Sequence, residues 1–136
     1  NDPLEEVLDV VGINEYWGWY YGEADKMEEF RDKPADTPVI ISEMGGGARW
    51  GNHGPKDERW TEEYQEKVLA ESLEIYLNHP DVSGVAIWQF CDIRVTGEYW
   101  QKRPRTMNNK GTVDQFRRPK IAYKAVKNRM EAVGGN

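Results

Sequence analysis

The residue whose type and setting most clearly suggest chemistry is Glu43, in the stretch VIISEMGGGARW at residues 39–50. An apolar, β-branched run leads into this carboxylate, and three glycines follow one residue later. Glycines let a backbone approach a ligand closely, so a strand that ends here can present the carboxylate to a substrate. The structural alternative is a carboxylate that pairs with an arginine, and the position of Glu43 alone leaves both interpretations open.

Polar and aromatic residues also close two other apolar runs. Asn14, Glu15 and Tyr16 end the first run, and Trp88 and Asp92 end the third. Each has a plainer interpretation: Glu15 as an exposed or salt-bridged side chain, and Trp88 as part of the core. The aromatic segment at 17–22 could likewise be core, and the MNNKG segment could be a turn with glycine or asparagine in the left-handed conformation.

No pattern in the sequence predicts a metal or a cofactor. His53 and His79 are isolated and lack the spacing of metal ligands, and no G-x-S-x-G, phosphate loop or H-E-x-x-H is present. We therefore expect chemistry carried by side chains alone.

The elements that would position these residues alternate along the chain. Helices are expected at residues 22–33, after a cap at Thr61, and from Pro119 to Gly134. Strands are expected at residues 7–14, 37–43 and 82–90. This alternation predicts an α/β fold with parallel strands and right-handed crossovers, in which ligands bind at the carboxyl ends of the strands.

Composition narrows the class of protein. The chain has 136 residues, enough for one domain, and a net charge of −6, which argues against a nucleic-acid partner because phosphate binding needs a basic excess. The single Cys91 excludes an internal disulfide. No apolar run approaches the ~20 residues that cross a bilayer, so no membrane partner is expected. No signal-peptide pattern is present, so we expect a soluble protein, cytoplasmic if the parent protein also lacks one.

Four motifs, INEYWGWY, IISEMGG, IWQFCDIR and NNKG…RRPK, resemble in order and spacing the C-terminal part of a family 2 glycoside hydrolase barrel, above all that of the β-glucuronidases. The resemblance covers residues from about 3 to about 132. It implies a partial TIM barrel, with residues 1–136 forming the C-terminal portion of the catalytic domain. Three βα units would supply strands six to eight of the barrel.

The resemblance also implies a role for each matching residue. Glu43 corresponds to the nucleophile of retaining hydrolysis, and a carbohydrate is the expected partner. The implied sugar-binding residues are Asn14, Tyr16 and Tyr20, with Trp88 as the floor of the site and Asn108 and Lys110 gripping a uronic acid carboxylate. Two departures stand out: Trp17 replaces a family tyrosine, and Pro104 stands where some relatives have an arginine, between Arg103 and Arg105.

Retaining hydrolysis also needs a second carboxyl group, as general acid, about 5–5.5 Å from the nucleophile. In the family this glutamate lies upstream on strand four. Glu15 does not fit that role, because side chains alternate along a strand and Glu15 points away if Asn14 faces the site. We therefore expect the isolated chain to be inactive.

Three alternatives remain open at this point: a β-galactosidase-type hydrolase, a carbohydrate-binding module without turnover, and a half-barrel that assembles with itself or with a missing half. The residues Asn1-Asp2-Pro3 suit a chain cut from something longer. A partial barrel would leave a strand edge unpaired, and such an edge invites pairing with another chain.

Overall fold

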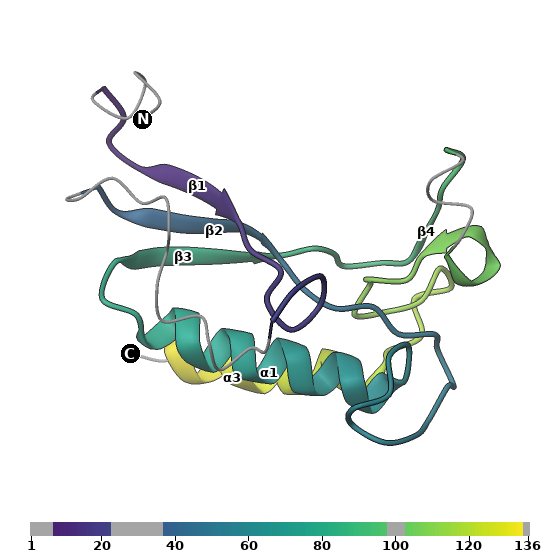
Figure 1. Ribbon diagram of the computed structural model, residues 1–136. Coiled ribbons are helices and arrows are strands. Elements are labelled where there is room, and N and C mark those ends of the chain that lie inside the picture. The colour runs from purple at the N-terminus through teal and green to yellow at the C-terminus, as the bar shows by residue number, and fades with distance from the viewer. Residues whose placement is uncertain (1–6, 23–36, 98–102, 135–136) are drawn as a thin grey trace.

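The computed structural model describes residues 7–22, 37–97 and 103–134 (Figure 1). The helix expected at 22–33 lies almost wholly outside these residues. The main elements are the strands β1 (Val11–Asn14), β2 (Val39–Met44) and β3 (Val82–Ile87) and the helices α1 (Glu62–Asn78) and α3 (Ile121–Gly134). A smaller unit comprises β4 (Ile93–Arg94), a 3₁₀ turn (Pro104–Thr106) and β5 (Met107–Asn108).

The three main strands form one parallel sheet in the order β1-β2-β3. Helices α1 and α3 lie together on one side of this sheet (Figure 1). The predicted α/β fold with parallel strands and flanking helices is therefore confirmed. The short strands β4 and β5 pair antiparallel next to the carboxyl ends of the main strands (Figure 1).

Two strands are shorter than the sequence predicted. β1 begins only at Val11, which pairs with Val39, the first residue of β2. β3 ends at Ile87 because the backbone then changes partners: Trp88 still donates to the Met44 carbonyl at 2.8 Å, but Gln89 donates to the carbonyl of Lys110 at 3.1 Å. The chain therefore leaves the sheet at the level where the candidate residues lie.

The core lies between the sheet and α1. Strand β2 supplies its centre, and apolar side chains of α1 and α3 complete it. The fully buried members are Val39, Ile41, Met44, Leu69, Leu73, Tyr76 and Ala122. On the opposite face of β2, Ile40 remains exposed.

Thr61 and Glu62, which are neighbours in the chain, fix the starts of α1 and α3 respectively. The Thr61 hydroxyl accepts a hydrogen bond from the Tyr64 amide at 3.1 Å, which confirms the predicted cap of α1. The next residue, Glu62, is buried, and its carboxylate accepts from the amides of Gly51 at 2.6 Å and Ile121 at 2.7 Å. One side chain of α1 therefore also fixes the start of α3, at Ile121 instead of Pro119.

Candidate active site

A bulge in β2 changes the direction of the Glu43 side chain. Strict alternation would place it on the same buried face as Val39 and Ile41. The register with β3 shifts between Ile41 and Met44, however, and Met44 takes the buried position at 1% exposure. Glu43 is consequently only half-buried at the carboxyl end of the sheet. Bulges often redirect a side chain beside an active site, and this one frees the carboxylate from the core.

The glycines after Glu43 allow unusually close packing. Gly45 has a φ of 151°, and a Cβ there would lie 2.5 Å from the Trp88 carbonyl oxygen. A Cβ at Gly47 would lie 3.0–3.1 Å from the rings of Trp60 and Trp19. These glycines therefore let the backbone pass against the end of β3 and a layer of aromatic rings.

Tyr16 contacts the carboxylate directly. Its hydroxyl donates to Glu43 Oε2 at 2.7 Å, and burial together with this anionic neighbour raises the pKa of Tyr16 above its ordinary value. The adjacent Glu15 accepts instead from the Tyr21 hydroxyl at 2.9 Å. The two carboxylates thus bond to different tyrosines.

Lys110 lies against the same tyrosine and is buried, with 2% exposure. Its Nζ lies 3.4 Å from the centre of the Tyr16 ring and 4.3 Å from that of Tyr20, and it has no hydrogen-bond partner among the described residues. Burial, and then the nearby positive charge of Arg103, lowers the pKa of Lys110 to about 6, against the opposing effect of Glu43. The rings of Tyr16 and Tyr20 thus form an aromatic cage around Nζ of Lys110. Buried Trp19, whose ring centre lies 5.5 Å from this nitrogen, also belongs to this cage, a role that the sequence did not predict.

Arg103 is a site residue that the sequence analysis missed. Its guanidinium donates to Asn108 Oδ1 at 2.7 Å and to the Tyr20 hydroxyl at 2.9 Å. The turn that begins at Pro104 brings it there, whereas Arg105 is exposed. A guanidinium therefore lies beside Asn108 although Pro104 occupies the expected arginine position, and the signal in the sequence was the arginine one residue earlier.

Asn14 and Trp88 lie at the same end of the sheet but make different contacts. Asn14 is opposite Glu43 in the β1–β2 register, and its side chain accepts from the Ser42 hydroxyl at 2.8 Å. Trp88 follows β3, is 39% exposed, and precedes a cis peptide bond. Every residue assigned to the site thus lies at a strand's carboxyl end or in residues 103–111.

The MNNKG segment contains the predicted turn, at Asn109 and Lys110, but none of its glycine or asparagine residues is left-handed. The left-handed residues near it are Arg105 and Thr106, with φ of 57° and 55°. Gly111 is needed for another reason: a Cβ there would lie 2.3 Å from the Asp92 amide nitrogen and from the Val113 carbonyl oxygen.

Parallel strands with flanking helices, and candidate groups collected at their carboxyl ends, define a protein of the α/β class that includes the (β/α)8 barrels. Within the described residues, no helix is both long and apolar enough to span a membrane. The site itself combines a carboxylate, a cage of aromatic rings and two nearby basic side chains, Arg103 and Lys110.

Comparisons with known proteins specify the class further. No protein-family model matches the chain. A β-glucuronidase of Streptococcus agalactiae serotype V is 30% identical over 94% of this chain and 22% of its own length. Among solved structures, a GH2 β-galacturonidase from Eisenbergiella tayi bound to galacturonate is 40% identical, with a TM-score of 0.81 over 93% of this chain and 24% of that one. The Ruminococcus gnavus β-glucuronidase is 27% identical, with a TM-score of 0.77 over 93% of this chain and 23% of that one.

These similarities confirm the resemblance that the four motifs indicated: the chain is similar in sequence and fold to a segment of the GH2 β-glucuronidases and β-galacturonidases. It spans less than a quarter of the length of each.

Proposed function

We propose that this chain is the C-terminal part of a family 2 catalytic barrel, that it supplies strands six to eight, and that the complete protein is a retaining β-uronidase. The similarity to GH2 enzymes over 93–94% of the chain supports this proposal. So does the collection of the candidate residues at the carboxyl ends of the strands, where barrel enzymes carry their chemistry.

In this mechanism the Glu43 carboxylate attacks the anomeric carbon while a general acid protonates the departing glycosidic oxygen. Water then hydrolyses the glycosyl–Glu43 ester, and the same acid, now a base, accepts the proton of that water. The Tyr16 hydroxyl, bonded to Glu43 Oε2, orients the nucleophile. In this proposal the general acid comes from a part of the barrel upstream of these strands, and Glu15, which accepts from Tyr21, is not assigned that role.

One observation carries the choice of a charged sugar: Tyr16 contacts both the carboxylate of Glu43 and the side-chain nitrogen of Lys110. The nucleophile and the buried amine of Lys110 therefore contact the same phenol. Arg103 lies close enough to lower the pKa of Lys110 and also donates to Asn108. An anion bound beside Arg103 and Lys110 would raise the pKa of Lys110 again and favour its protonated form, and the carboxylate of a uronic acid is such an anion.

The relatives indicate two candidate sugars. Those in Streptococcus agalactiae and Ruminococcus gnavus are β-glucuronidases, at 30% and 27% identity, whereas the Eisenbergiella tayi enzyme is a β-galacturonidase at 40%. Glucuronate and galacturonate differ only at C4, so contacts to the carboxylate do not separate them. A β-galacturonide is therefore a second candidate substrate, and the ratio of kcat/KM for the two nitrophenyl uronides decides between them.

In this proposal the missing strands of the barrel pair with the outer edges of β1 and β3, each of which has one neighbour among the described strands. Self-association of the segment through those edges is the non-catalytic alternative. The mass of the chain in solution, measured with and without the rest of the barrel, separates the two.

Covalent labelling tests the proposal. In the complete protein, a 2-fluoro uronyl fluoride should label Glu43, and Glu43→Gln should be neither labelled nor active. The matched control is Glu15→Gln, which removes the adjacent carboxylate and should still be labelled. Labelling of another residue, with Glu43→Gln still active, would refute the role of Glu43.

A further inference from the structure

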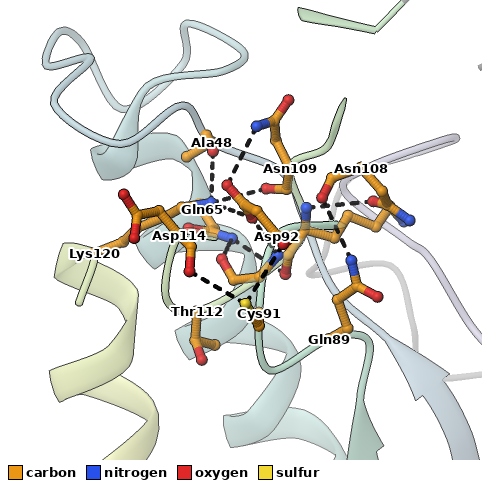
Figure 2. Close-up of polar contacts among 12 residues, drawn as sticks. Ala48, Gln65, Gln89, Cys91, Asp92, Asn108, Asn109, Thr112, Asp114 and Lys120 are labelled. Carbon is orange, nitrogen blue, oxygen red and sulfur yellow. Dashed lines mark hydrogen bonds and ion pairs between the residues drawn. The ribbon is translucent and has the colours of Figure 1, made fainter. Parts of the chain in front are cut away.

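Near the site, a buried ion pair and its hydrogen bonds join four separate segments of the chain (Figure 2). The side chains of Lys120 and Asp92 are 0% and 2% exposed, and Lys120 Nζ lies 2.8 Å from Asp92 Oδ1. The same nitrogen donates to the Ala48 carbonyl at 2.6 Å and to the Asn109 carbonyl at 3.0 Å. An ammonium group has three donors, so each N–H of Lys120 has its own acceptor on a different segment.

Asp92 holds both chain neighbours of Lys110. Its Oδ2 accepts from the Asn109 side-chain amide at 3.2 Å, and its Oδ1 accepts from the Gly111 backbone amide at 2.9 Å. The Asn109 carbonyl also accepts from the Ala48 amide at 3.0 Å. The backbone of Lys110 is therefore fixed on both sides.

A neutral side chain spans the same two segments. Gln65 of α1 donates from Nε2 to the carbonyls of Gly46 at 2.9 Å and Gly111 at 3.0 Å. The segment that follows Glu43 and the segment that carries Lys110 are thus joined in three ways: by Gln65, by Lys120 of the ion pair, and by the backbone hydrogen bond from Ala48 to Asn109.

Stability alone is a weak explanation for this pair. Removing two charges from water offsets most of their attraction, and well-packed apolar residues often stabilise a core as much. Burial indeed raises the pKa of Asp92 and lowers that of Lys120, with their mutual attraction opposing both shifts. What the pair adds is geometry, because an ammonium with three fixed acceptors permits only one arrangement of the segments that provide them.

We propose that Asp92 and Lys120 are positioning residues, which hold the 108–111 loop against the 45–48 segment and so set the placement of Lys110 relative to Glu43. Neither residue touches the sugar in this proposal; both act through the loop. The inference rests on the proposed function, since it assigns the pair to recognition of the uronate by Lys110.

The test uses the complete protein and compares its affinities for two inhibitors, a uronic acid iminosugar and its neutral counterpart. Covalent labelling of Glu43 counts the fraction of molecules with an intact active site. Lys120→Met removes all three donors, and Asp92→Asn keeps the shape and one acceptor oxygen. We expect Lys120→Met to reduce the preference for the charged inhibitor tenfold or more per labelled site, and Asp92→Asn to reduce it by a smaller factor. Lys124→Met, an exposed lysine on α3, is the matched control and should keep the full preference.

The outcomes are distinct. A purely structural pair would lower the number of labelled sites but leave the preference per site within twofold of the unmodified protein, and that result would overturn the proposal. Failure of both variants to fold would overturn it as well, because the pair would then serve the whole domain. An unmodified protein without preference for the charged inhibitor, or without labelling at Glu43, would instead refute the proposed function.

Discussion

The two halves of the candidate site are held in place by different means. The 43–48 segment depends on its backbone: a bulge turns Glu43 out of the core, Gly45 allows a contact that a Cβ would prevent, and Gly47 allows one that a Cβ would crowd. The 107–111 segment depends on buried polar side chains, chiefly Asp92 and Lys120. Both segments lie at the same end of the sheet.

This difference predicts different responses to mutation. Where the backbone packs this closely, no residue with a Cβ can replace glycine without overlap. Changes in the 43–48 segment therefore act through steric overlap and strain. A loop held by hydrogen bonds can keep its fold while losing its position, so changes around the 107–111 segment act on ligand preference. The four predictions below test this contrast, beginning with the largest effect.

The largest effect tests whether the two segments suffice for catalysis. The 136-residue chain carries both, but its Glu15 is bonded to Tyr21. We expect the isolated chain to hydrolyse aryl β-uronides at least about 10²–10⁴-fold more slowly than the complete protein, the usual contribution of a general acid. Release of nitrophenol measures the rate. Turnover close to that of the complete protein, abolished by Glu15→Gln, would contradict this expectation.

The next effect concerns backbone packing. Gly45→Ala would place a Cβ 2.5 Å from the Trp88 carbonyl at a φ of 151°. We expect it to lower the free energy of unfolding by about 3–5 kcal/mol, from strain and overpacking together. Gly51 is the control, because its φ is also positive, at 76°, but a Cβ there meets nothing within 4 Å. Gly51→Ala should therefore have only the strain effect, about 1–2 kcal/mol. Urea unfolding compares the two variants, and equal losses would rule out the steric account.

The third effect concerns the charge on Lys110. A bound uronate favours the protonated form of Lys110, so its carboxylate loses one charge-assisted hydrogen bond in Lys110→Ala, a change of about 1.5–3 kcal/mol or roughly ten- to a hundredfold in kcat/KM for uronides. Neutral β-glucosides and β-galactosides lack that carboxylate and should be affected far less. Steady-state kinetics on both kinds of substrate provide the comparison. Equal losses on both would mean that Lys110 does not bind the carboxylate, and the proposal would retreat to a family 2 glycosidase of another sugar.

The smallest effect is on the pH dependence of stability. The pKa of Lys110 is about 6 in the folded chain and 10.5 ordinarily, so between these values the unfolded state binds one more proton. The free energy of unfolding must then rise with pH, by up to about 1.4 kcal/mol per unit, and the Lys110 contribution levels off below pH 6. Lys110→Met should remove this slope, as measured by urea unfolding between pH 6.5 and 8. An unchanged slope would show that Lys110 stays protonated.

Local patterns in the sequence were enough to predict the three parallel strands and the two helices, α1 and α3, that pack on them. The runs around Ile13, Ile41 and Val85 are strands in the structure, and Thr61 caps the helix as expected. These features depend on residues close together in the chain, where apolar spacing and capping chemistry determine the outcome.

The features that the sequence did not predict depend on contacts between residues far apart in the chain. The bulge that aims Glu43 is a property of the register between β2 and β3, which no single strand specifies. Arg103 reaches Asn108 only through a turn with left-handed residues, and Asp92 meets Lys120 from 28 positions away. Sequence spacing therefore predicted candidate groups at one end of the sheet but not the side chains that hold them in place.

The shared carboxylate of Glu62 has a consequence for motion. It accepts from the amides of Gly51 and Ile121, which are 70 positions apart in the chain. Rotation of this one side chain would release both N–H groups, so opening of the loop near Gly51 and fraying of the first turn of α3 become a single event. The two amide hydrogens should accordingly exchange with deuterium at matching rates, and they should accelerate together if Glu62 is replaced.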